Sequence, residues 1–218
     1  MEALKIDFSI EELEKKLNGE KWTPELGKFL VSNDICFEVI DGLICVKSKP
    51  FEHDSAKNVI SSKLNSYLKE NNLPCKAAVE MRISRNNGGD YLIPDIIVLG
   101  KNEGKFSDNG MYSGVPKLVI EVLSLNRRDD LNRKLFIYAE MGIPEYWTVD
   151  LDGNSITQYV LSGSTYGGKH INHTEGVISH HICGLTLNVE ELFHDIIEEL
   201  EFYIGDKDNQ FSSTSLFN

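Results

Sequence analysis

The sequence has no long apolar run, no paired cysteines and no leader-like beginning. No apolar stretch approaches the roughly 20 residues that a membrane helix needs, and no basic segment followed by an apolar run opens the chain. The four cysteines are scattered without a C-x-x-C pair, which is typical of free thiols in a reducing compartment rather than of a disulfide framework. These absences predict a soluble, cytoplasmic protein.

Basic residues are also scarce. The sequence has only 22 Lys and Arg residues against 34 Asp and Glu residues, which gives a formal net charge of -12. Because Lys and Arg supply most of the non-specific affinity for nucleic acid, this charge disfavours a tight duplex binder. It does not exclude a nuclease, since a local basic face or a bound metal ion offsets carboxylates. Internal repeats, a phosphate-binding glycine motif and a serine nucleophile elbow are absent as well.

The length and the apolar content favour one domain. With 218 residues, of which 41% are hydrophobic, the chain can bury a sizeable core. We expect a single domain over residues 1–204. Residues 205–218 are polar and rich in serine, and we expect them to form a disordered tail.

Two short helices and a hairpin are predicted in the N-terminal part. Capping patterns at Ser9 and at Thr23 begin the two helices. Asp41-Gly42 between two apolar runs predicts a β-hairpin over residues 37–47. Glu38 lies in its first arm beside apolar neighbours. Two interpretations of Glu38 are open: a solvent-facing residue of an edge strand, or a member of a functional site.

A longer helix is predicted over about residues 54–68, because apolar residues recur there at helical spacing. His53 stands at its entrance, where a histidine is either a cap or packing residue or a functional group. Residues 77–84 alternate between apolar and polar types, which predicts a half-buried strand. Residues 100–115 are polar and interrupted by glycines, which predicts a long loop.

Two apolar runs each carry one carboxylate. Asp95 lies in the run over residues 91–99, directly after Pro94, and Glu121 lies in the run over residues 117–123. A charge inside a buried strand is costly unless it is paired or holds a cation. Pro94 lacks an N–H, which predicts a strand irregularity of the kind that aims a side chain into a site.

A small divalent cation would explain both carboxylates. If the two strands pair, Asp95 and Glu121 meet at one end of the sheet. Mg²⁺ prefers oxygen ligands and keeps several waters, so that these carboxylates and the backbone carbonyl of Val122 would suffice. The other interpretation of Glu121 is a buried carboxylate that is paired with a Lys or an Arg.

A helix predicted over about residues 128–141 supplies a candidate for that positive charge, Lys134. An ammonium beside a metal site would orient or deprotonate an attacking water and offset the charge of a phosphorane. Asp130 and Lys134 are four residues apart on this helix. The alternative for Lys134 is therefore an ordinary ion pair on the surface.

Pro94-Asp95, followed by Glu121-Val122-Leu123-Ser124, resembles the PD-(D/E)xK nuclease superfamily. More narrowly, an ordered set of segments over about residues 37–193 is similar to the Uma-two family of restriction-endonuclease-like proteins. The segments are EVIDG, a histidine before a helix, IPDIIVL, IEVLS, D-x-x-x-K, GIPEYWTVD and GLTLNVEELF. The resemblance implies an α/β fold with a restriction-endonuclease-like core, in which helices flank a central mixed β-sheet.

The resemblance also implies a metal-dependent nuclease site. Asp95 and Glu121 would bind Mg²⁺, or Mn²⁺ in its place. Leu123 occupies the position at which the superfamily normally carries its lysine, and the family instead takes this lysine from the next helix, here Lys134. The supporting candidates, as a third ligand or as contacts to the ligands, are Glu38, His53 and Asp130.

The predicted function is hydrolysis of phosphodiester bonds in nucleic acid, with DNA as the favoured substrate. The acidic composition favours the alternative, a non-catalytic interaction or regulatory module that keeps the acidic pocket. A homodimer is compatible with both, and no membrane partner is expected.

Overall fold

The computed structural model describes residues 10–47, 50–85, 89–123, 128–171, 176–179, 181–182 and 184–204. The chain divides into two compact units. Unit 1 consists of Met1–Pro50, Arg82–Ile93 and Phe106–Ser113, and unit 2 consists of Phe51–Met81, Pro94–Lys105 and Gly114–Asn218. The single domain over residues 1–204 stays a prediction, and residues 205–218 lie outside the described residues.

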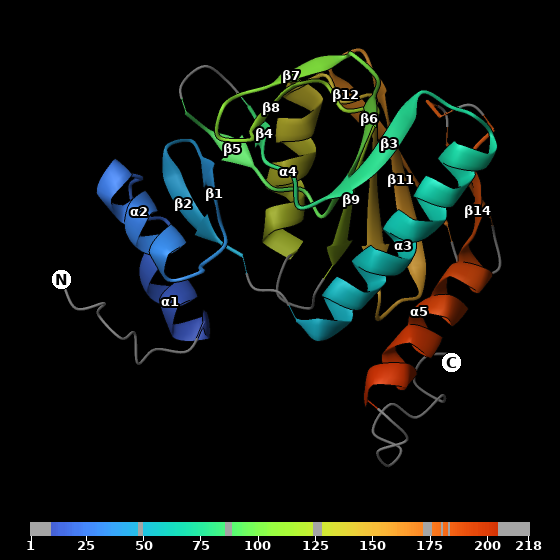
Figure 1. Cartoon of the computed structure of the whole chain (residues 1–218), viewed down its shortest axis with the longest axis horizontal. Coiled ribbons are helices and arrows are strands. Elements are labelled where there is room, and N and C mark those ends of the chain that lie inside the picture. Colours follow the sequence, from blue (N-terminus) through green and yellow to red (C-terminus); the bar gives the residue numbers. More distant parts are fainter. Residues whose placement is uncertain are drawn as a thin grey trace. The chain divides into compact units, whose positions relative to one another are not determined.

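Unit 1 contains two helices, α1 (Ile10–Leu17) and α2 (Pro24–Ser32), and a mixed sheet with the strand order β2-β1-β5-β4-β8-β7 (Figure 1). The strands are β1 (Phe37–Ile40), β2 (Leu43–Val46), β4 (Ile83–Ser84), β5 (Tyr91–Leu92), β7 (Gly104–Phe106) and β8 (Tyr112–Gly114), of which the last two extend into unit 2. Strand β1 pairs antiparallel with β2 and β5, and β4 pairs parallel with β8.

Local sequence signals account for the elements of unit 1. Thr23 caps α2, because its side chain accepts a backbone N–H of the first turn. Asp41 and Gly42 both have positive φ, at 55° and 72°, as the tight turn between β1 and β2 requires. The Asp90 carboxylate accepts the N–H groups of both turn residues, at 2.9 and 3.0 Å. The predicted hairpin is confirmed.

Unit 2 contains a larger mixed sheet with the strand order β12-β11-β10-β9-β6-β3. Its strands are β3 (Cys75–Val79), β6 (Ile96–Gly100), β9 (Leu118–Leu123), β10 (Glu145–Asp150), β11 (Ser155–Ser162) and β12 (Thr165–Ile171). Strands β9 and β10 are parallel, and the other pairings are antiparallel. The helices are α3 (Phe51–Glu70), α4 (Arg128–Glu140) and α5 (Val189–Ile204), and β13 (Gly176–Ile178) pairs with β14 (Thr186–Asn188). Within the described ranges, no helix is long and apolar enough to cross a membrane.

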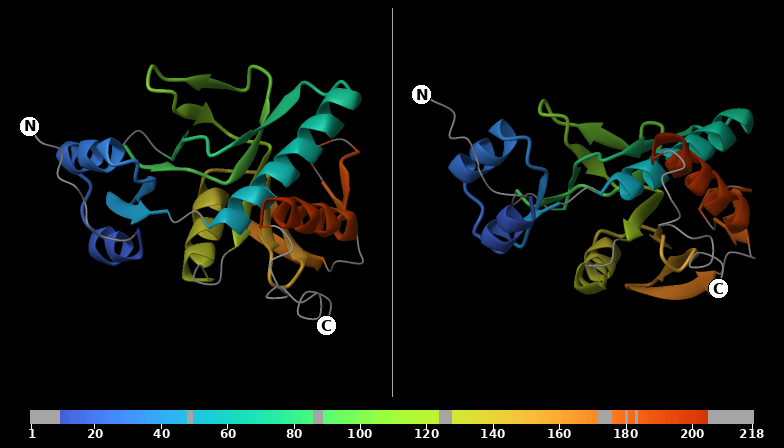
Figure 2. Two further views of the ribbon diagram at one scale, coloured as in Figure 1. Left: turned by 60° about the horizontal axis from the view of Figure 1, so that its bottom comes forward. Right: turned by 90° about the horizontal axis from the view of Figure 1, so that it is seen from below.

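Strand β9 is apolar except for Glu121 because both of its faces are covered. Ile120 and Val122 lie in the core formed with α3 and α5, as does Trp147 of β10. Residues of the other parity face the opposite way, where α4 reaches Glu121. Figure 2 shows α3 and α5 together on one side of the sheet and α4 apart from them on the other side. The predicted mixed sheet flanked by helices is confirmed.

Three segments depart from simple strands or loops. The strand predicted over residues 77–84 is interrupted at Glu80, whose φ of 50° is left-handed, so that β3 and β4 are separate strands. The run over residues 91–99 is split into β5 and β6 around Pro94, as the missing N–H predicts. The predicted loop over residues 100–115 contains β7 and β8, where the rings of Phe106 and Tyr112 lie 5.4 Å apart.

A buried carboxylate at the start of β10 ties unit 2 together. Glu145 is fully buried, and its Oε1 accepts hydrogen bonds from Trp147 Nε1 and Gln158 Nε2, both at 2.7 Å. Its Oε2 accepts the Ser179 hydroxyl at 2.7 Å and the His181 N–H at 3.1 Å. One side chain therefore links β10, β11 and the segment before β14. Donors of this number stabilise a buried carboxylate without a cation.

We predict that Glu145→Ala lowers the free energy of unfolding by about 3 kcal/mol or more, because it leaves several buried donors unpaired and opens a cavity. Urea denaturation followed by tryptophan fluorescence measures this loss. The matched control is Glu198→Ala on the exposed face of α5, for which we expect a change below about 1 kcal/mol. Equal losses in the two variants would contradict the assignment.

Candidate active site

Glu121 is the only charged residue inside β9, and α4 supplies its partners. The side chain is 3% exposed. Lys134 Nζ donates to Glu121 Oε1 at 2.9 Å, and the Tyr138 hydroxyl donates to the same oxygen at 2.6 Å. Lys134 and Tyr138 are four residues apart, which places both on the face of α4 that covers the sheet. Two donors thus fix the orientation of the Glu121 carboxylate.

Lys134 does not lie on the protein surface. It is 2% exposed, so the alternative of an ordinary surface pair is wrong for this side chain. The side chain of Asp130 lies outside the described ones. The other alternative, a buried Glu121 paired with a lysine, describes the contact that is present. A buried ion pair of this kind is compatible with a metal site, because one ammonium and two carboxylates leave an excess of negative charge that attracts a cation.

Asp95 lies directly before β6, and the pairing of β6 with β9 places Asp95 next to β9. The pairing of β6 with β9 sets Ile96 opposite Ile120, so that the register continues from Asp95 toward Glu121. The Val122 N–H donates to Asp95 Oδ2 at 2.9 Å, and the Asp95 side chain is 2% exposed. The predicted pairing of the two strands is therefore confirmed. The metal-ligand roles of Asp95, Glu121 and the Val122 carbonyl stay predictions.

His53 lies in the first turn of α3 and contacts Asp95. Its Nε2 is 3.0 Å from Asp95 Oδ2. An ionised carboxylate only accepts hydrogen bonds, so the ring donates through Nε2. The other ring nitrogen, Nδ1, is buried without a hydrogen bond to the described residues, and Asp54 Oδ1 is 3.8 Å away. The imidazole is thus oriented by a carboxylate, as is common for histidines that bind a metal or transfer a proton.

Glu38 belongs to unit 1 and is 1% exposed, so the solvent-facing interpretation is wrong. Strand β1 is not an edge strand, because β2 and β5 flank it. Glu38 Oε1 accepts the N–H of Ile93 at 2.7 Å, and Lys47 Nζ donates to the carbonyl of Ile93 at 2.6 Å. The two charged groups are 3.9 Å apart. Within unit 1, they hold both backbone groups of the residue that precedes Pro94.

Asp95 and Glu121 have the donor chemistry that a hard cation such as Mg²⁺ prefers. Both offer carboxylate oxygens, both are buried, and the Nδ1 of His53 beside Asp95 lacks a hydrogen bond within the described residues. The three side chains do not form a compact three-ligand group, because no such group of described residues includes them. The residues therefore fit an ion held by two carboxylates and water rather than a cage made of protein alone.

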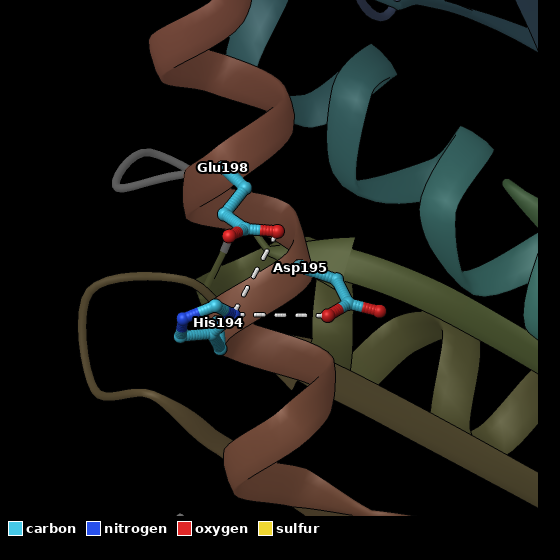
Figure 3. A group of neighbouring side chains, drawn as sticks. All are labelled: His194, Asp195 and Glu198. Carbon is cyan, nitrogen blue, oxygen red and sulfur yellow. Dashed lines mark ion pairs between the residues drawn. The ribbon is translucent and has the colours of Figure 1, made fainter.

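One other cluster of potential ligands occurs among the described residues. His194, Asp195 and Glu198 on α5 bring their ligand atoms within 4.8 Å of one another (Figure 3). His194 and Glu198 are each 67% exposed, and Lys63 already pairs with Asp195 at 2.5 Å. Exposed ion pairs one helical turn apart are frequent on surfaces and need no metal. We do not assign a site to this cluster.

Tyr138 is the site residue whose role the sequence did not indicate. The helical pattern assigns its ring to the apolar face of α4, and the ring is buried there. Its hydroxyl, however, donates to Glu121. A buried tyrosine hydroxyl needs a hydrogen-bond acceptor, and Tyr138 lies one turn after Lys134. This spacing of four residues was the feature of the sequence that could have indicated a contact of Tyr138 with Glu121.

Comparison with known proteins agrees with this fold. The model of the Uma2 family, described as "Putative restriction endonuclease", matches residues 24–190, which include every candidate site residue. A solved structure from Anabaena variabilis ATCC 29413, titled as a putative nuclease belonging to DUF820, has a TM-score of 0.62 at 20% sequence identity. The alignment covers 87% of this chain and 99% of that one. The likeness confirms the fold. No curated protein matches the chain.

We predict that Lys134→Met lowers the free energy of unfolding by about 3–5 kcal/mol at neutral pH, because the Glu121 charge stays buried without its cation. Adding Glu121→Gln to this variant recovers most of the loss, since the unpaired charge is then removed. Urea denaturation of the two single variants and the double variant measures the coupling.

The matched control is Lys117→Met, which breaks the more exposed pair with Glu103 at 2.7 Å. For this control we expect a loss below about 1 kcal/mol. A Lys134→Met variant that is no less stable than Lys117→Met would show that the buried pair has no special role.

Proposed function

We propose that this chain, which belongs to the Uma2 family of restriction-endonuclease-like proteins, is a metal-dependent endonuclease that hydrolyses phosphodiester bonds of DNA. The observation that carries the proposal is the presence of two buried carboxylate residues on paired neighbouring strands, Asp95 directly before β6 and Glu121 in β9. The Asp95 carboxylate accepts the N–H of Val122, which follows Glu121 in β9. A buried carboxylate needs hydrogen-bond partners or a cation, and a metal ion would use the oxygens of both residues.

The metal would be held by Asp95 and Glu121, with the Val122 carbonyl and water as further ligands. Mg²⁺ is the expected ion, and Mn²⁺ is the substitute that accepts the same oxygen donors. When bound, such an ion supplies polarisation of a phosphoryl oxygen and a lower pKa for its water. The protein's part is to hold both carboxylates in place. Asp95 is aligned by the Val122 N–H and His53, and Glu121 is aligned by α4.

Lys134 would act on the reacting groups from the side of α4. Its side chain is buried and hydrogen-bonded to Glu121, so it is positioned before a substrate arrives. A positioned ammonium offsets the negative charge that develops on a phosphorane and orients the attacking water. Leu123 stands where the superfamily normally carries this lysine. The long Lys134 side chain from the helix fills the same role.

The supporting residues would act through the ligands. His53 fixes the Asp95 oxygen that also accepts the Val122 N–H. Glu38 holds the backbone of Ile93, two residues before Asp95 in the chain. The contribution of Asp130 is proposed from its place four residues before Lys134 alone. None of these residues needs to touch the substrate for its loss to weaken the site.

The second candidate function is a non-catalytic interaction or regulatory module. The net charge of -12 favours it, because an acidic protein attracts nucleic acid poorly. The contacts of Glu121 with Lys134 and Tyr138 also satisfy the carboxylate without a metal. Cleavage and metal binding by purified protein separate the two functions.

We predict that the protein nicks supercoiled DNA in the presence of Mg²⁺ or Mn²⁺, and that Asp95→Asn and Glu121→Gln each lower the rate by about 100-fold or more. Both substitutions keep the shape of the side chain and remove the charge that attracts the cation. Calorimetric titration with Mn²⁺ should show weaker binding in the same two variants.

Glu198→Gln is the matched control, because it alters the exposed cluster on α5 and leaves the proposed site intact. It should cleave DNA and bind Mn²⁺ like the wild type. The nuclease proposal fails if wild-type protein cleaves neither single-stranded nor duplex DNA or RNA above the level of the Asp95→Asn variant. Thermal denaturation without metal checks that all variants are folded.

A further inference from the structure

A second buried lysine lies close to Asp95, and the proposed chemistry does not use it. Lys57 is on α3, one helical turn after His53, and is 4% exposed. Its Nζ donates to Asp54 Oδ1 at 2.6 Å and also to Glu80 Oε1. Burial opposes its charge and is the largest single influence on its pKa. The hydrogen bonds and charges of Asp54 and Glu80 together outweigh burial and raise the pKa of Lys57. The ammonium is therefore charged at neutral pH.

Glu80 has an unusual backbone conformation for its residue type. It follows the last residue of β3 and has a φ of 50°, in the left-handed region that glycine adopts without strain and other residues seldom occupy. A residue persists in this region only when its surroundings hold it there. The carboxylate of Glu80 is held by Lys57.

The backbone of Glu80 contacts Asp95 directly. Its N–H donates to the Asp95 carbonyl at 3.1 Å. The side chain of Asp95 is fixed at the same time by Val122 and His53. Asp95 is thus held at its carboxylate by β9 and α3, and at its main chain by the strained residue that ends β3.

We propose that Lys57 is a positioning residue for the metal site: by pairing with Glu80 it holds the left-handed backbone that fixes the main chain of Asp95. The inference rests on the proposed function, because it takes Asp95 as a metal ligand. Helix α3 then supports Asp95 through two residues. His53 contacts the Asp95 carboxylate, and Lys57 pairs with Glu80, which donates to the Asp95 carbonyl. Lys57 itself touches neither metal nor substrate.

The test is a calorimetric titration of the full-length protein with Mn²⁺. We expect Lys57→Met to weaken Mn²⁺ binding by about 10-fold to 100-fold, as for other residues that orient a metal ligand. The double variant Lys57→Met, Glu80→Gly should bind within about threefold of the wild type, because glycine adopts the left-handed backbone without an anchor and carries no carboxylate at position 80. A merely structural role would lower the unfolding temperature but leave the Mn²⁺ affinity of the folded protein unchanged.

A matched control is available on the same helix. Lys63→Met removes a lysine of α3 whose partner is Asp195, and it should not change Mn²⁺ binding. If Lys57→Met does not fold, the comparison of Glu80→Ala with Glu80→Gly decides the question. Both variants remove the carboxylate, but only alanine keeps the backbone strain, so Glu80→Ala should bind Mn²⁺ about tenfold more weakly.

Failure of the inference differs from failure of the proposed function. Wild-type protein that binds no Mn²⁺, or Asp95→Asn that binds it equally well, overturns the metal site and the inference with it. If wild type binds Mn²⁺ and Asp95→Asn does not, then unchanged affinity in folded Lys57→Met overturns the inference alone. Equal Mn²⁺ affinities of Glu80→Ala and Glu80→Gly would also overturn the inference alone.

Discussion

The hydrogen bond from the Val122 N–H to the Asp95 carboxylate is the contact on which the site depends. It joins the irregular segment before β6 to the C-terminal end of β9, and it sets Asp95 beside the residue that follows Glu121. A carboxylate placed there is almost entirely removed from water. A backbone N–H and an imidazole contact this carboxylate and stabilise it. The rest of unit 2 supplies these partners.

The two buried carboxylates of the candidate site receive their partners from helices on opposite faces of the sheet. On the α3 side, His53 contacts the Asp95 carboxylate. Lys57 pairs with Glu80, whose N–H donates to the Asp95 carbonyl. On the α4 side, Lys134 and a tyrosine hydroxyl serve Glu121. Each of the two buried carboxylates therefore has partners from its own helix. These partners hold both carboxylates in place, as the proposed metal site requires before a cation or a substrate is bound.

The main features of the site follow from local sequence patterns. An apolar run with a single carboxylate, a proline before Asp95 and the helical spacing of apolar residues after His53 are short-range signals, and the structure has the corresponding strands, break and helix. The burial of Glu38 was not predictable in this way, because β5, which flanks β1, comes from some fifty residues later in the chain. The left-handed backbone of Glu80 was likewise hidden, since it depends on Lys57 of another element rather than on residue type. Lys134 was indicated by family resemblance, not by its spacing alone.

Anomalous diffraction from crystals soaked in Mn²⁺ tests the central claim most directly. The account predicts a strong anomalous peak within coordination distance of both the Asp95 and the Glu121 carboxylates. It also predicts that the peak disappears in Asp95→Asn crystals. A peak only at the exposed cluster of His194, Asp195 and Glu198, or a peak at Glu121 that is unchanged by the loss of the Asp95 charge, would contradict it.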